Sequence, residues 1–260
     1  MRKSSWGNSR FNQAVPVDLS SAKEIMLREH LTDRGISNIR VLKAFQEVPR
    51  EAFVPPQLVD LSYEDSPLDI GSGQIPASGG IPQGAVTISQ PYTVAFMTQL
   101  LDPQPNDVIL EIGTGSGYQA AILSRLCQKV YTIERFGELA EKAEAVLKRI
   151  GYANVEVIVG DGSLGLPPEA LAKGGLPPRE AFNGIIVTAG APKIPQPLLD
   201  QLKVGGRLII PVQPRRFGVG APTGASEEMT KIIKTEEGVR KETFPGFRFV
   251  PLVGEFGFKD

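Results

Sequence analysis

The chain has 260 residues, and its 28 lysines and arginines against 29 aspartates and glutamates give a formal charge of −1. This balance argues against a protein that coats nucleic acid or is held on a membrane by a polybasic anchor. Cys127 and His30 are the only cysteine and the only histidine. A chain with one cysteine and one histidine cannot form an internal disulfide, a cysteine-based zinc site or a multi-histidine metal site. We therefore expect no metal.

The chain begins with a polar stretch that has no helical or strand periodicity. We interpret residues 1–20 as a tail. Ser21 and Glu24 then have the spacing of a capping box, which predicts a helix that starts there and stops at Gly35.

The rest of the chain alternates between helix-like and strand-like segments. Apolar residues at helical spacing predict helices over residues 41–48 and 94–101, around 122–126 and over 139–150. Short apolar runs predict strands at 107–112, 129–133, 155–159, 184–188 and 207–212. This alternation is typical of a doubly wound α/β fold whose mostly parallel sheet has helices on both faces. Residues 71–86 and 162–181 are rich in glycine and proline and are expected to be long surface loops.

A glycine-rich turn, Glu111-Ile-Gly113-Thr114-Gly115-Ser-Gly117, follows the first strand of this pattern. Glycines let the backbone turn tightly and approach a ligand closely, although a turn without a ligand is the plainer alternative. The spacing is not the G-x-G-x-x-G dinucleotide fingerprint. It therefore suits a ligand other than a dinucleotide.

Two acidic residues lie at the ends of the next two predicted strands. Glu134 ends the second strand, where a carboxylate can accept hydrogen bonds from both hydroxyls of a ribose. Asp161, followed by Gly162, closes the third strand. Asp161 alone suits a turn, but at a strand's carboxyl end it also suits an adenine amino group.

Together the E-x-G-x-G-x-G turn, Glu134 and Asp161 resemble the class I S-adenosylmethionine-dependent methyltransferases. The resemblance implies a Rossmann-like methyltransferase sheet behind an N-terminal helical preface, with S-adenosyl-L-methionine as the methyl donor. A ligand that has an adenosine but no phosphates agrees with the absence of the pyrophosphate-type glycine.

The segment Thr87-Ile88-Ser89-Gln90-Pro91 resembles the signature of the protein-L-isoaspartate O-methyltransferases. Further blocks similar to that family occur in order at residues 48–54, 63–65, 186–189, 194–195, 205–212 and 248–252. The resemblance covers about residues 22–253. It implies methyl transfer to the α-carboxylate of L-isoaspartyl residues, which is a protein-repair reaction with damaged peptides and proteins as partners.

The resemblance also implies roles for individual residues. Ser89 would be the catalytic residue, orienting the carboxylate without becoming a covalent nucleophile, and Ile88, Gln90 and Pro91 would contact the substrate. The cofactor-binding residues would be Thr87, Ser89, Glu111, Gly113, Thr114, Gly115, Gly117, Glu134, Arg135, Asp161 and Gly162. Taken alone, Ser89 also fits a helix N-cap before Pro91.

The chemistry explains why histidine is scarce. A carboxylate has a pKa of roughly 3.5–4 and is already ionised at neutral pH, so no general base is needed. The protein has to align the nucleophile with the methyl group. Methylation of another acceptor and a silent cofactor-binding module are the alternative functions.

Residues 21–260 are expected to form one domain with three regions: an N-terminal helical and active-site region (21–106), a cofactor-binding core (107–212) and a C-terminal substrate-side region (213–260). An insertion at residues 75–86 separates Gly73 and Gln74 from the Thr87 segment, and it is either a lid or a surface excursion. The extension at 164–181 is expected to lie away from the catalytic site.

No apolar run reaches the ~20 residues of a membrane helix, and no secretory signal is apparent. We expect a cytoplasmic monomer with no membrane or nucleic-acid partner.

Overall fold

The computed structural model describes residues 17–71, 86–214 and 226–259. Its main sheet has seven strands in the order β5-β4-β3-β6-β7-β8-β9. The strands are β3 (Val108–Ile112), β4 (Lys129–Glu134), β5 (Val155–Val159), β6 (Phe182–Val187), β7 (Leu202–Val212), β8 (Glu227–Thr235) and β9 (Gly238–Phe247). The first five in this order pair in parallel, and β8 and β9 are antiparallel. The predicted, mostly parallel sheet is confirmed.

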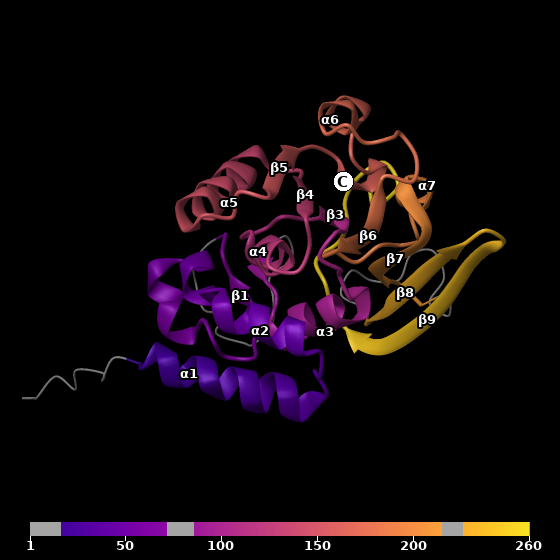
Figure 1. The fold of residues 1–260 in the computed structure, drawn as a ribbon. Helices are drawn as coiled ribbons and strands as arrows, with labels where there is room; N and C mark the ends of the chain where they lie inside the picture. Colours follow the sequence, from indigo (N-terminus) through magenta and orange to yellow (C-terminus); the bar gives the residue numbers. More distant parts are fainter. Residues whose placement is uncertain (1–16, 72–85, 215–225, 260) are drawn as a thin grey trace, which may run out of the picture.

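Helices cover both faces of this sheet (Figure 1). The α-helices of the described residues are α1 (Leu19–Ile25), α2 (Ile39–Glu47), α3 (Pro91–Leu101), α4 (Tyr118–Ser124), α5 (Gly137–Ile150), α6 (Pro168–Lys173) and α7 (Gln196–Gln201), of which α1 lies apart from the sheet. Ile109 packs into the core under α3, α4 and α5, whereas the next residue, Leu110, packs into the core under α6 and α7. Side chains alternate across a strand, so apolar residues at both positions bury both faces. The doubly wound arrangement follows from this.

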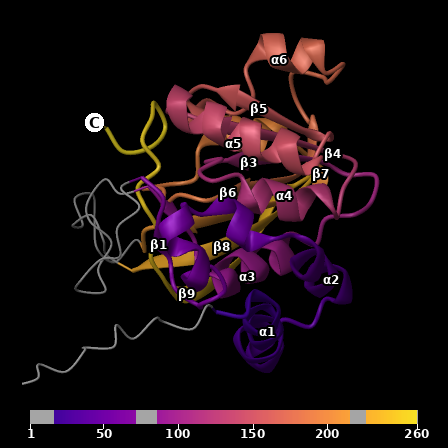
Figure 2. The same ribbon diagram turned by 90° about the vertical axis from the view of Figure 1, so that its left-hand side faces the viewer.

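The N-terminal preface packs beside α3 (Figure 2). Its first helix starts at Leu19 with Asp18 as N-cap, so the capping box predicted at Ser21 is wrong. The Ser21 hydroxyl instead donates to the Asp18 carboxylate at 2.6 Å. The helix continues through a π-helical turn and a 3₁₀ turn and ends at Gly35, whose φ is 91°. That end is where the sequence predicts it.

Two other expectations need correction. The segment 162–181 is not only a loop, because it contains the 3₁₀ turn η5 (Gly162–Leu164) and the short helix α6. The antiparallel hairpin β8–β9 is absent from the prediction. Its turn, Glu236-Glu237, lacks the Asn-Gly or Asp-Gly signal of a tight hairpin, and β9 is exposed along most of its length.

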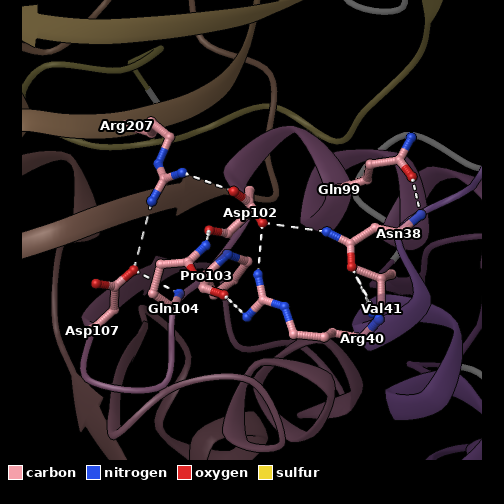
Figure 3. Close-up of polar contacts among 9 residues, drawn as sticks. All are labelled: Asn38, Arg40, Val41, Gln99, Asp102, Pro103, Gln104, Asp107 and Arg207. Carbon is pink, nitrogen blue, oxygen red and sulfur yellow. Dashed lines mark hydrogen bonds and ion pairs between the residues drawn. The ribbon is translucent and has the colours of Figure 1, made fainter.

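A polar junction fixes the C-terminal end of α3 (Figure 3). Asp102 has a left-handed φ of 45° and accepts hydrogen bonds from Asn38, Arg40 and Arg207 at 3.3, 2.8 and 3.3 Å. These residues belong to the start of α2 and to β7. The junction therefore ties the helical preface and the sheet to one end of α3, and Ser89 lies beside the other end.

Among the described residues, no helix combines the length and the apolar character needed to cross a membrane.

Candidate active site

A cavity of about 260 Å³ opens at the carboxyl ends of β3 and β6. β3 pairs with β4 on one side and with β6 on the other, so the direction in which the strand order grows reverses at this point. In open α/β sheets such a switch point is where ligands bind. The predicted site residues that line the cavity are Thr87, Ile88, Ser89, Gln90, Gly113, Thr114, Gly115, Glu134, Arg135 and Gly162.

The glycine turn forms one wall of this cavity. Gly113, Gly115 and Gly117 have φ values of 93°, 53° and 87°, which L-residues with side chains adopt only at a cost. A Cβ at Gly113 would lie within 3.0 Å of the Thr188 hydroxyl. Gly117 does not line the cavity; a Cβ there would approach Leu147 to 3.2 Å. The structure therefore gives Gly117 a role in packing α4 against α5.

Glu134 connects the second strand to the glycine turn. Its carboxylate accepts hydrogen bonds from the backbone N–H of Gly115 at 3.0 Å and of Phe136 at 3.2 Å. The side chain lines the cavity and is 7% exposed. Arg135 follows on the same wall and is exposed.

Glu111 lies behind the turn and does not line the cavity. It is fully buried, and neither carboxylate oxygen has a hydrogen-bond partner among the described residues. Burial raises the pKa of Glu111 to about 8; the nearby Thr132 hydroxyl opposes this rise, and the nearby Glu134 adds to it. The folded protein therefore keeps a proton on Glu111 at neutral pH.

This proton makes the stability of the protein depend on pH. Glu111 binds its proton up to a pH of about 8 in the folded chain but, with its ordinary pKa of 4.5, loses it much earlier in the unfolded chain. The folded state holds more protons in this window, so the free energy of unfolding should fall as the pH rises through it, by up to about 1.4 kcal/mol per pH unit.

Glu111→Gln should reduce this slope, because glutamine cannot ionise. Urea denaturation of both proteins between pH 5 and pH 8 measures it. Equal slopes in the two proteins would show that Glu111 does not carry the proton.

Asp161 serves the fold of the C-terminal segment. Its carboxylate accepts hydrogen bonds from the N–H of Ser163 at 2.9 Å and of Glu255 at 2.7 Å. Burial raises the pKa of Asp161, but the bonds from Glu255 and Ser163 outweigh it and the net shift is downward. Asp161 does not line the cavity, whereas Gly162 does. In this structure Asp161 is therefore the turn former that its sequence position also suggests.

Ser89 lies between β2 (Thr87–Ile88) and α3 and lines the same cavity as Glu134. The N-cap of α3 is Gln90, without a side-chain capping bond, so the interpretation of Ser89 as N-cap is wrong. The half-buried Ser89 hydroxyl forms no hydrogen bond with another described residue. Pro91 is buried as the first residue of α3 and does not line the cavity.

A further wall comes from the C-terminal region, which the sequence places on the substrate side without naming individual site residues in it. Residues 248–253 line the cavity together with Met97, Thr188 and Ala189. The segment is held against the end of β6 by two backbone bonds: Gly190 N–H to Val250 at 2.8 Å and Leu252 N–H to Gly190 at 2.7 Å. Residues 75–85 of the insertion lie outside the described residues, and Val86, which ends it, lines the cavity.

Comparison with known proteins gives one consistent result. The family described as Protein-L-isoaspartate(D-aspartate) O-methyltransferase (PCMT) matches residues 21–257. Protein-L-isoaspartate O-methyltransferase 2 of Pelobacter propionicus is 47% identical over 240 residues, which are 91% of this chain and 92% of that protein. Protein-L-isoaspartate O-methyltransferase 2 of Nitrosococcus oceani is 48% identical over 216 residues, covering 83% and 85% of the two chains.

Solved structures agree. A protein-L-isoaspartate O-methyltransferase superposes with a TM-score of 0.72 at 27% identity, covering 90% of this chain and 67% of its own. A putative one from Plasmodium falciparum, solved in complex with S-adenosyl-L-homocysteine, gives a TM-score of 0.66 at 23% identity and covers 88% and 96% of the two chains. The second likeness concerns the fold alone.

Proposed function

The chain belongs to the protein-L-isoaspartate O-methyltransferase family, and from this we propose that Ser89 orients the α-carboxylate of an L-isoaspartyl residue for methylation. The protein is an S-adenosylmethionine-dependent carboxyl O-methyltransferase of protein repair. The observation that carries the proposal is that the glycine turn and Ser89 line the same cavity.

The walls of the cavity suit the methyl donor. S-adenosylmethionine supplies a methyl group on a positively charged sulfur, which is already electrophilic. Gly113 and Gly115 place two residues without a Cβ on one wall, and Glu134 presents a carboxylate at the adjoining strand end. We propose that Glu134 accepts from the ribose, Gly113 and Gly115 back the methionine portion, and Thr87 lies at the methyl end.

The residues of this chain then have to orient the acceptor carboxylate, and none of them has to act as a general base. The acceptor carboxylate arrives ionised, and a neutral hydroxyl such as that of Ser89 orients it without holding it too strongly. An interaction stronger with the free carboxylate than with the transition state would slow the transfer. Ile88 and Gln90 flank Ser89 on the same wall and are proposed to contact the peptide.

Transfer of a labelled methyl group tests this function. The protein, labelled S-adenosylmethionine and an L-isoaspartyl peptide should give base-labile label on the peptide, whereas the same peptide with normal aspartate should stay unlabelled. Label on both peptides, or only on a small molecule or an RNA, would indicate another acceptor. Absence of any transfer despite cofactor binding would indicate a silent module.

Three expectations belong to the same proposal: a cytoplasmic location, a monomeric state and the lack of a nucleic-acid partner. Size-exclusion chromatography coupled to light scattering tests the monomeric state. The lid and the surface excursion at residues 75–86 both stay open as predictions, and deletion of the insertion should raise the KM for isoaspartyl peptide only in the first case.

A further inference from the structure

Arg50 is a buried cation that bonds to the backbone of Ser89, between β2 and α3. It is 0% exposed. Its Nε donates to the Ser62 carbonyl at 2.6 Å, its Nη2 donates to the Ser89 carbonyl at 2.8 Å, and its guanidinium lies over the Tyr118 ring at 4.8 Å. Burying a charge is costly unless it is well bonded, so this placement calls for an explanation.

The two hydrogen bonds tie together parts of the chain that are distant in sequence. Arg50 begins the 3₁₀ turn η3 (Arg50–Phe53), Ser62 caps the end of η4 (Pro56–Leu61), and Ser89 precedes α3. A planar guanidinium presents several donors in fixed directions, whereas the ammonium of lysine is a compact charge on a flexible stem. Arginine is therefore suited to hold both carbonyl oxygens at once.

Asp65 holds the start of α3, which follows Ser89 directly. Its carboxylate accepts from the Tyr92 N–H at 3.0 Å and from the Gln90 side-chain amide at 3.4 Å. It also pairs with Arg34, whose guanidinium stacks on the Tyr92 ring at 3.7 Å. The start of α3 has no capping side chain of its own, and Asp65 supplies an acceptor for one of its unpaired N–H groups.

We infer that Arg50 and Asp65 are positioning residues for Ser89: they fix the backbone at the serine and at the start of α3, which follows it, so that the Ser89 hydroxyl, which bonds to no other described residue, keeps one direction. The inference rests on the proposed role of Ser89. Methyl transfer relies on alignment, and a displacement of about 1 Å can cost roughly a hundredfold in rate. Neither residue lines the cavity, so each acts through the segment it holds.

A double-mutant cycle tests this inference. Arg50→Lys keeps the positive charge but loses the planar guanidinium that donates to both the Ser62 and the Ser89 carbonyl. It should lower kcat by about ten- to a hundredfold. The Kd for S-adenosyl-L-homocysteine should change by less than about twofold, because the hydrogen bonds of Arg50 go to Ser62 and Ser89 and not to the glycine turn or Glu134. In a Ser89→Ala background the same change should alter kcat by less than about twofold, since the hydroxyl to be positioned is gone.

Asp102→Asn is the matched control. It removes a charge from the junction at the opposite end of α3, keeps a residue that tolerates a left-handed φ, and should leave kcat within about twofold of the parent. If Arg50→Lys does not fold, Asp65→Asn, at a half-buried side chain, takes its place in the cycle.

The outcomes distinguish a failure of the positioning role of Arg50 from a failure of the proposed role of Ser89. An equal loss of kcat from Arg50→Lys in both backgrounds, or no loss in either, overturns the positioning role. Parent-like turnover of Ser89→Ala alone overturns the role of Ser89 itself. Loss of cofactor affinity in Arg50→Lys would assign Arg50 to general stability and would also overturn the inference.

Discussion

Gly113→Ala should lower the free energy of unfolding by about 2–4 kcal/mol and abolish measurable binding of S-adenosyl-L-homocysteine. The φ of 93° at this position costs a residue with a Cβ about 1–2 kcal/mol. In addition, the new Cβ would displace the Thr188 hydroxyl. That hydroxyl donates to the carbonyls of Ile112 and Gly113 at 3.0 and 2.8 Å, so moving it also weakens the link between β3 and β6.

Gly151→Ala is the matched control for this substitution. Gly151 has nearly the same φ, 92°, but a Cβ there would meet nothing within 4 Å, and the residue caps α5 away from the cavity. Its loss of stability should be limited to the backbone strain of about 1–2 kcal/mol, with cofactor binding unchanged. Urea denaturation and calorimetric titration measure the two quantities. Equal stability losses in the two variants, with binding intact in both, would contradict the argument.

The sequence predicts an element correctly where its local pattern of apolar residues matches the side chains that the fold buries. The segments that form β3, β4 and β5 are short apolar runs bounded by turns, and all three are strands close to their predicted limits. Glu134 ends β4 as predicted, and it reaches the cavity wall because the end of a parallel strand fixes which edge of the sheet a residue reaches.

What the sequence does not indicate depends on contacts between distant segments. Glu111 and Gly117 belong to the glycine turn by pattern, yet the turn bends so that one is buried behind it and the other packs on Leu147. The carboxylate of Asp161 accepts a hydrogen bond from the N–H of Glu255, which is 94 residues further along the chain. No local periodicity encodes that bond, nor the position of residues 248–253 along the cavity.

Ser89→Ala should lower kcat for isoaspartyl peptide by about ten- to a hundredfold, corresponding to the roughly 1.5–3 kcal/mol of a hydrogen bond to a charged group. A covalent nucleophile would lose far more, because no other group could take its place in the reaction. The Kd for S-adenosyl-L-homocysteine should stay nearly constant. The size of the loss therefore distinguishes orientation from covalent catalysis.

Ser124→Ala provides the control for removing a half-buried hydroxyl. Ser124 ends α4, donates to the Ala121 carbonyl at 2.8 Å and does not line the cavity, so its loss should leave kcat within about twofold of the parent. The substitutions are compared by steady-state kinetics with saturating S-adenosylmethionine. If Ser89→Ala turns over like the parent, the acceptor carboxylate is oriented by other groups on the wall, and residues 248–253 become the part of the cavity to test.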